Sequence, residues 1–187
     1  MKIGYSGKAA VLFGLGAAII YLVMVLGTLR YLTDLALVLP FDLRPTGYSQ
    51  VDAAVLLEAL GEAGRQFYLT RQIPLDTLYP ALLALTLVST LRWRAVRFGP
   101  TLMTRIGVPL AILAATFDYL ENLGIGLMLL VGADPTLVQA ASTATMLKSA
   151  LTTAAMLAVI ATLIPILFRR LLYQPAMKSA RRSRRLS

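Results

Sequence analysis

The chain has 187 residues, of which 58% are hydrophobic and only 14% charged, with a formal net charge of +9 at pH 7. Soluble domains are roughly 45–50% apolar, so this composition and a mean hydropathy of +0.73 indicate an integral membrane protein. Because the sequence contains no Cys and no His, disulfides, thiol nucleophiles, Cys/His zinc sites, histidine-ligated haem and His-based catalytic triads are excluded.

A membrane core about 30 Å thick requires about 20 residues of helix, and four apolar runs suggest spans. They cover residues 9–29, 77–91, 101–131 and 135–168. Pro80 lies in the expected first turn of the second span, where a missing N–H is tolerated. Asp134 is a natural N-cap for the fourth span, with Pro135 at its first helical position. The sequence therefore predicts an all-α fold, with residues 1–168 forming a single domain built as a four-helix membrane bundle.

The segment between the first two spans is predicted to contain an amphipathic helix. Ser49 and Asp52 have the spacing of a capping box. Apolar residues then recur at helical intervals from Leu56 to Phe67, and charged residues occupy the opposite face. We expect this helix to cover residues 50–69 and to lie on the external surface.

The distribution of Lys and Arg predicts the orientation, because basic residues are retained on the cytoplasmic side of short loops. They concentrate at the N-terminus, in the second connection and in the C-terminal tail, whereas residues 33–76 carry more acidic than basic side chains. We therefore expect an inner-membrane protein with both termini in the cytoplasm. The basic tail, residues 169–187, is predicted to be disordered and to attract anionic lipids. Nucleic acid is not an expected partner, because the tail lacks a folded basic module.

Charged residues within the third and fourth spans are the most informative part of the sequence. Asp118, Glu121 and Asn122 share one face of a helix, since they are spaced at i, i+3 and i+4. A hairpin that turns near residue 133 pairs residues whose numbers sum to about 266, which places Asp118 opposite Lys148 and Glu121 opposite Thr145. An ionisable group near the bilayer centre costs at least about 2.5–3.5 kcal/mol, so it needs a partner or a function. The sequence predicts an Asp118–Lys148 ion pair inside the bundle.

Two carboxylates and one lysine leave one negative charge unbalanced. Glu121 is therefore either protonated or needs a second partner. Arg65 of the external helix is a possible counter-ion, and Arg65 with Tyr68 could hold a phosphate or carboxylate group. The alternative is that Arg65 forms a solvated ion pair with Glu62, three residues away.

Three stretches of the sequence resemble a group of small four-helix bacterial membrane proteins for which no activity is known. The stretches read Leu60-Gly-Glu-Ala-Gly-Arg-Gln-Phe-Tyr-Leu69, Leu75-Asp-Thr-Leu-Tyr-Pro80 and Phe117-Asp-Tyr-Leu-Glu-Asn122, and the resemblance as a whole covers about half of the chain. The resemblance implies that motif positions are occupied by Gly64, Arg65, Tyr68, Asp76, Asp118, Glu121 and Asn122. It implies no substrate.

The sequence leaves three functions open. The first is an accessory or assembly bundle in which the buried Asp/Glu/Lys network joins helices, with a membrane-protein partner or a second copy of the chain. The second is a lipid-linked small-molecule binder or enzyme that uses the intramembrane carboxylates and opens to the external side. The third is a small ion or proton carrier. None of them calls for a cofactor or a metal. The candidate polar site comprises Asp118, Glu121, Asn122, Lys148, Arg65 and Tyr68.

Overall fold

The structure is a computed structural model that describes residues 7–183, with the backbone alone at residues 167 and 169–183. Every regular element in this range is helical. In chain order they are α1 (Gly7–Val23), the π-helix η1 (Met24–Thr28), α2 (Leu29–Ala36), the 3₁₀ turn η2 (Phe41–Leu43), α3 (Gln50–Phe67), the π-helix η3 (Tyr68–Gln72), α4 (Ile73–Phe98), α5 (Leu102–Val131) and α6 (Pro135–Ser183). The basic residues Lys2, Arg184 and Arg185, at the two ends of the sequence, lie outside the described residues.

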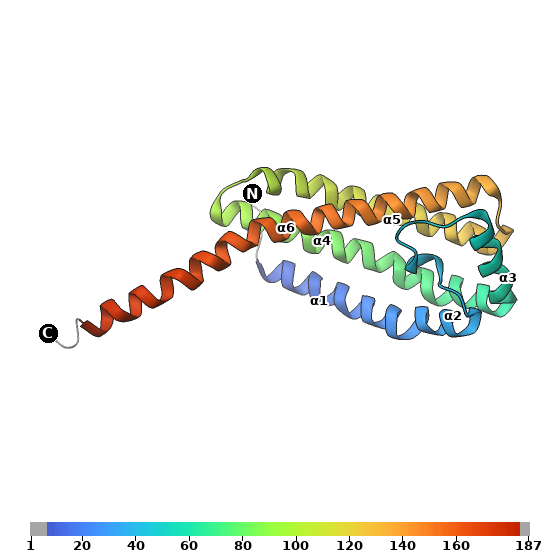
Figure 1. Cartoon of the computed structure of the whole chain (residues 1–187), viewed down its shortest axis with the longest axis horizontal. Helices are drawn as coiled ribbons and strands as arrows, with labels where there is room; N and C mark the ends of the chain where they lie inside the picture. The colour runs from blue at the N-terminus through green and yellow to red at the C-terminus, as the bar shows by residue number, and fades with distance from the viewer. Residues whose placement is uncertain (1–6, 184–187) are drawn as a thin grey trace.

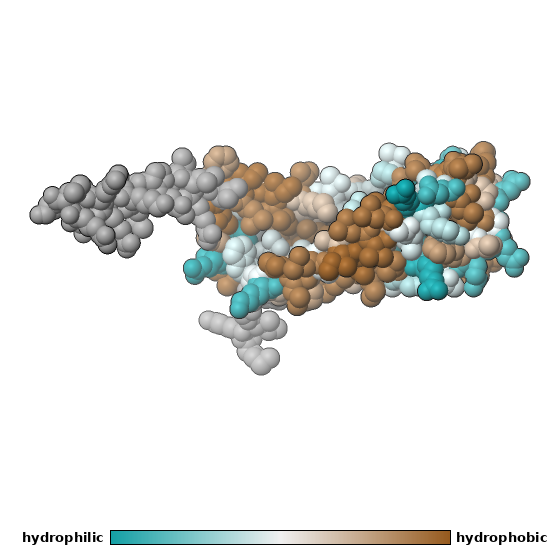
Figure 2. All heavy atoms as spheres, turned by 90° about the horizontal axis from the view of Figure 1, so that it is seen from below, coloured by the Kyte–Doolittle hydropathy of each residue, from teal (hydrophilic) through white to brown (hydrophobic). Residues whose placement is uncertain are grey.

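Four helical stretches are long and apolar enough to cross a membrane, which agrees with the predicted number. These stretches are Gly7–Ala36, Gln50–Phe98, Leu102–Val131 and Pro135–Ile166. Apolar side chains cover much of the middle of the bundle in Figure 2, and hydrophilic ones gather toward its right end. Many leucines of the described residues are exposed, as expected of helices that face an apolar solvent.

The helices form a bundle in which α4 contacts α1, α5 and α6, and α5 packs along α6 (Figure 1). A tight turn at Gly132 joins α5 to α6, and α3 lies at this end, which we call the α3 end. The opposite end, where Gly99 leads from α4 into α5, is called the Arg94 end. There Arg94 is 9% exposed and donates to the backbone carbonyls of Gly99 and Thr162.

The second span differs from its predicted bounds, because α3, η3 and α4 follow one another without a loop. The helix expected at residues 50–69 ends in a π-helix, and α4 replaces the shorter span expected at residues 77–91. Pro80 is therefore an interior residue of α4 and not a first-turn residue. Pro74 takes the position at the helix start that the sequence analysis gave to Pro80.

A bend at Gly61 divides α3 into two parts. Gly61 has φ 56° and ψ −168°, a backbone conformation that residues with a Cβ rarely adopt. The Ser49 cap is present as predicted, with the Ser49 hydroxyl and the Asp52 carboxylate each accepting from the other residue's backbone N–H. The apolar face was only partly predicted: Leu56 and Leu60 are buried, but Ala63 lies beyond the bend and is exposed.

The helix α6 continues past residue 168, the predicted end of the fourth span. Its backbone is helical to Ser183, whereas the sequence analysis predicts disorder from residue 169. Most residues of this stretch, Pro175 excepted, are good helix formers such as Leu, Ala, Met and Arg, which favours continuation of the helix. The N-cap of α6 is as predicted, because the Asp134 Oδ1 accepts from the backbone N–H groups of Thr136 and Leu137 at 3.0 and 3.1 Å.

The connection between α2 and α3 inserts into the α3 end of the bundle. Phe41 is fully buried, and its ring lies 4.7 Å from that of Tyr48 and 6.3 Å from that of Tyr68, between centroids. The backbone N–H of Tyr48 donates to Ser142 Oγ at 2.9 Å, which anchors the loop about 10 Å along α6. A Cβ at Gly47 would lie 2.6 Å from the same oxygen, so this close approach requires glycine. We call residues 40–48 the plug loop.

The close packing of α5 on α6 can be tested with two glycines of the same helix. A Cβ on Gly124 would lie 2.7 Å from the Cβ of Ala141, whereas one on Gly126 would meet no atom within 4 Å. We expect Gly124→Ala to destabilise the protein by roughly 1–3 kcal/mol through overpacking. Gly126→Ala should be neutral or stabilising by up to about 1 kcal/mol, because alanine favours helix. Thermal unfolding followed by Trp93 fluorescence measures both, and equal effects would contradict this packing.

Candidate functional site

Polar side chains gather inside the α3 half of the bundle and form what we call the polar cluster. Its members come from the plug loop, η3, α4, α5 and α6. They are Asp42, Tyr48, Tyr68, Gln72, Asp76, Asp118, Glu121, Asn122, Thr145 and Lys148.

The deepest part of the polar cluster is centred on Lys148. Its Nζ lies 3.5 Å from Asp118 Oδ1 and also contacts Glu121 Oε2. The Thr145 hydroxyl donates to Glu121 Oε1 at 2.8 Å. Both pairings predicted from the hairpin register are therefore confirmed. The side chain of Glu121 is 0% exposed and that of Lys148 15% exposed, so this ion pair is held away from water.

Asn122 compensates for a missing backbone hydrogen bond in α4. Because Pro80 has no N–H, the carbonyl of Asp76, four residues earlier, cannot form its usual helical bond. The Asn122 Nδ2 donates to this carbonyl at 2.8 Å and contacts Asp118 Oδ1 at 3.4 Å. Asn122 thus joins α5 to the interrupted turn of α4 and to the ion pair.

A second group of side chains links the plug loop to α4. The Tyr68 hydroxyl donates to Asp42 Oδ2, and the Gln72 amide donates to Asp42 Oδ1 at 3.3 Å. The Thr28 hydroxyl in turn donates to Gln72 Oε1 at 2.5 Å. Asp76, only 2% exposed, has the Asp42 carboxyl within hydrogen-bonding reach. This second group continues the polar cluster from Lys148 toward the α3 end.

Three buried atoms of the polar cluster have no hydrogen-bond partner and no charged partner among the described residues. They are Asp76 Oδ2, Asn122 Oδ1 and the Tyr48 hydroxyl. Burial raises the pKa of Tyr48, and the nearby Glu121 carboxylate raises it further, so this hydroxyl stays neutral and can donate. An unsatisfied buried polar atom costs about 1–3 kcal/mol, so three in one place require an explanation.

Arg65 takes a role that the sequence analysis did not predict. Arg65 lies beyond the bend at Gly61 and donates back to the Leu57 carbonyl through Nε and NH2 at 3.0 and 2.9 Å. Among residues 7–183, the ion pair of Glu121 is with Lys148 and not with Arg65, and no pair joins Arg65 to Glu62. Tyr68 is fully buried, and its hydroxyl donates to Asp42.

Sequence reasoning missed Asp42, Tyr48 and Gln72, and it singled out Asp76 only as a motif position of the resemblance. Asp42 and Asp76 were assigned to the external segment, whereas the structure buries Asp76 and leaves Asp42 partly buried. The usable signal was the spacing of Asp76 and Pro80, because a proline frees the carbonyl four residues before it. No local pattern identifies Asp42, since its position depends on the insertion of the plug loop.

The polar cluster is closed toward the Arg94 end. Beyond Asp118 and Lys148 the bundle interior contains the apolar side chains of Leu87, Ala111 and Ala155, packed against further leucines and valines. Asp118 is 13 residues from the end of α5 at Val131, or about 20 Å along the helix. The polar interior thus extends from the α3 end to the middle of the bundle.

No family model matches the chain, and comparisons with characterised proteins and with solved structures find no similar one.

Proposed function

We propose that the chain is a four-span membrane protein whose polar cluster binds and releases protons through the α3 end. In this proposal both termini and the Arg94 end face the cytoplasm, and the bent helix α3 lies at the external surface. Four helices of sufficient length and apolarity support the membrane assignment. The concentration of arginine at the Arg94 end supports the orientation.

The observation that carries the proposal is the excess of carboxyl groups over cations. The polar cluster contains four carboxyl groups, those of Asp42, Asp76, Asp118 and Glu121, and a single ammonium group, that of Lys148, which contacts Asp118 and Glu121. Buried charges are stable only when they are paired or neutralised, and one lysine can balance one of the four. Protons are the simplest compensation, and no three acidic side chains among residues 7–183 are grouped as they would be around a metal ion.

The hydrogen bonds indicate which carboxyl group carries a proton. Asp42 accepts from Tyr68 and Gln72, as an ionised carboxylate does. Asp76 has no donor at Oδ2, although it lies beside Asp42. A protonated Asp76 can donate to Asp42, which removes the repulsion between the two groups and leaves Asp42 as the charged partner.

Asp42 is the member of the polar cluster at which protons are expected to enter. It is half-buried and belongs to the plug loop, whereas Asp76, Asp118 and Glu121 are buried. The order Asp42, Asp76, Asp118 forms a series of carboxyl groups from the surface inward, the arrangement that proton relays in membrane proteins use.

The other functions considered from the sequence are less well supported. If the buried charges only joined helices, the ion pairs of Lys148 would be sufficient. The unpartnered buried oxygen of Asp76 would then have no explanation. Asp118, Glu121 and Lys148 line none of the described grooves, whereas the binder or enzyme hypothesis would favour an open one beside them. Lipid contacts of the basic tail, a protein partner and self-association stay predictions.

Infrared spectroscopy of the protein reconstituted in lipid membranes tests proton binding. Protonated carboxyl groups have a C=O stretching band that carboxylates lack. We expect wild-type protein to show this band at pH 7, and Asp76→Asn to lose one carboxyl group's share of it. The part of the band that belongs to Asp76 should decrease as the pH is raised. This decrease should require the Asp42 carboxyl.

Glu58→Gln is the matched control, because it removes one exposed carboxylate of α3 and should leave the band at pH 7 unchanged. A wild-type protein without the band at pH 7, or an Asp76→Asn protein that retains it in full, would contradict the proposal.

A further inference from the structure

Within residues 7–183, the π-helices η1 and η3 contact each other, although they belong to different candidate spans. Their last residues are joined, because the Thr28 hydroxyl donates to Gln72 Oε1 at 2.5 Å. π-Helices are rare and are frequently found at functional sites. The contact connects the first span to the polar cluster, of which Gln72 is a member.

The Gln72 amide is fully buried and is bonded at both of its ends. Oε1 accepts from Thr28, and Nε2 donates to Asp42 Oδ1 at 3.3 Å. An ionised carboxylate can only accept, so the NH₂ end of the amide must face Asp42 and the carbonyl end must face Thr28. The Thr28 hydroxyl therefore satisfies the buried acceptor that this orientation of the amide creates. The same hydroxyl lies 3.4 Å from the Met24 carbonyl, so its contact with Gln72 is the shorter one.

The series Thr28–Gln72–Asp42 stabilises the negative charge of Asp42. Hydrogen bonds in series polarise one another, so donation to the amide oxygen strengthens the donation from the amide nitrogen. A hydrogen bond to the charged form of a carboxyl group favours that form. Among the contacts of the described residues, Thr28 reaches Asp42 through Gln72 and does not touch the carboxyl group itself.

The other groups that face Asp42 do not involve Thr28. The Tyr68 hydroxyl of η3 donates to Asp42 Oδ2, and the Asp76 carboxyl of α4 lies within hydrogen-bonding reach. Arg44 of the plug loop is paired with Asp52 at 3.3 Å. Groups that act on Asp42 through their charge at longer range are Tyr48 of the plug loop, Asp118 and Glu121 of α5 and Lys148 of α6. All of them are kept in a Thr28 variant, which therefore reports on the contact with Gln72.

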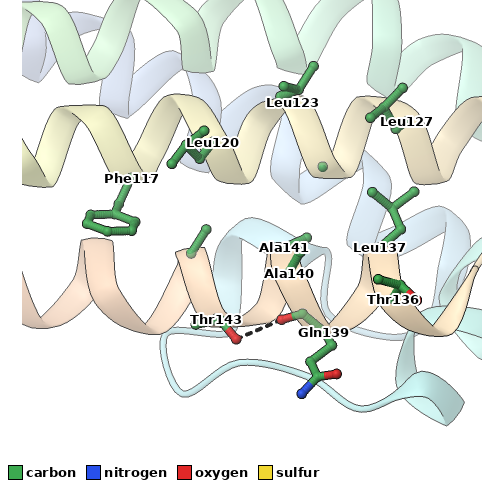
Figure 3. A pocket seen from close by; sticks show the side chains of 12 residues that line it. Phe117, Leu120, Leu123, Leu127, Thr136, Leu137, Gln139, Ala140, Ala141 and Thr143 are labelled. Carbon is green, nitrogen blue, oxygen red and sulfur yellow. Dashed lines mark hydrogen bonds between the residues drawn. The ribbon is translucent and has the colours of Figure 1, made fainter.

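The groove between α5 and α6 offers no second entry to these carboxyl groups. It has a volume of about 590 Å³ and is lined by Phe117, Leu120, Leu137 and further residues, none of them acidic (Figure 3). The Gln139 side chain points away from α5, and the Thr143 hydroxyl donates to the Gln139 carbonyl at 2.7 Å. This lining supports Asp42 as the carboxyl group at which a proton enters.

We propose that Thr28 is a positioning residue that, through Gln72, keeps Asp42 ionised, so that a proton entering at the α3 end passes on to Asp76. The inference rests on the proposed proton binding and assigns the control of its first step. In that step the Asp42 carboxylate takes a proton from water. Its new O–H bond then breaks as the proton moves to the Asp76 carboxylate, and Asp42 is ionised again. Stabilising the charge of Asp42 favours this transfer.

Infrared titration of an Asp76→Asn protein in lipid membranes tests the inference, because Asp42 then titrates without its acidic neighbour. The C=O band of Asp42 is the part of the signal that a further Asp42→Asn substitution removes. We expect Thr28→Val to raise the pH at which half of this band has appeared by about half a pH unit, a threefold change in proton affinity. Gln72→Leu removes the donor itself and should raise this midpoint by about one pH unit, a tenfold change.

Combined variants separate positioning from general damage to the structure. Thr28→Val added to Gln72→Leu should cause no further change, because Thr28 acts through Gln72. Thr28→Ser keeps the hydroxyl and should keep the original midpoint. Thr33→Val is the matched control, because the Thr33 hydroxyl, also in the first span, donates to the Leu29 carbonyl of its own helix at 2.9 Å.

An unchanged midpoint in Thr28→Val would overturn the inference. An equal shift in Thr28→Ser or in Thr33→Val, or a full additional shift when Thr28→Val is added to Gln72→Leu, would also overturn it. These outcomes do not depend on whether wild-type protein holds a proton at pH 7, since the titration uses protein without the Asp76 carboxyl. A wild-type protein without a protonated carboxyl group at pH 7 would instead contradict the proposed function.

Discussion

Lys148→Met is expected to destabilise the protein by roughly 3–5 kcal/mol, because it leaves the buried Asp118 and Glu121 without their shared cation. Combining it with Asp118→Asn and Glu121→Gln should recover most of the stability, because no unpaired charge then remains buried at this site. Thermal unfolding in detergent, followed by Trp93 fluorescence, measures the loss and the recovery.

Arg30→Met is the matched control for this series. Arg30 pairs with Asp34 at 3.7 Å, but both side chains are more than 70% exposed, so its removal should cost less than about 1 kcal/mol. A comparable loss of stability in Arg30→Met and Lys148→Met would contradict the interpretation that Lys148, Asp118 and Glu121 form a buried, mutually dependent charge group. A triple variant no more stable than Lys148→Met would also contradict it.

Phe41→Ala is expected to release the plug loop and to cost roughly 3–5 kcal/mol, because a fully buried aromatic side chain is replaced by a cavity. Loss of the Phe41 contacts with Tyr48 and Tyr68 should free residues 40–48 from the bundle end. Hydrogen exchange measured by mass spectrometry should then rise in this segment while the middle of α5 stays protected.

The control for the plug loop is Phe168→Ala, since Phe168 is 59% exposed and its truncation leaves no internal cavity. Unchanged exchange of residues 40–48 in Phe41→Ala would show that the ring does not hold the loop in place.

The sequence was sufficient to predict features that depend on helical geometry over a short distance. The Asp118–Lys148 and Glu121–Thr145 contacts follow from one tight turn and a constant rise per residue, so residue numbers alone predict them. The Ser49 and Asp134 caps are likewise local, because a cap involves residues two or three positions apart.

Features that depend on an exception to helical geometry were not predictable in the same way. The role of Asn122 arises because Pro80 interrupts α4, which leaves a carbonyl to be satisfied by a side chain. Arg65 reaches the Leu57 carbonyl across the bend at Gly61. Asp42 reaches the polar cluster only because the plug loop folds back into the bundle, a tertiary event with no local signature.

The π-helix at residues 24–28 has a consequence for how the first span tolerates changes in length. Each residue turns an α-helix by about 100°, so inserting one further residue at η1 would rotate α2 relative to α1 by about that angle. Leu29, Leu32 and Ala36, the buried residues of α2, would then turn away from the rest of the bundle. By contrast α1 buries only Ala17 among its 17 residues, so rotation would change little there. The direction in which the side chains of α2 face is thus set at η1, and point substitutions along α1 should be tolerated far more readily than single-residue insertions at residues 24–28.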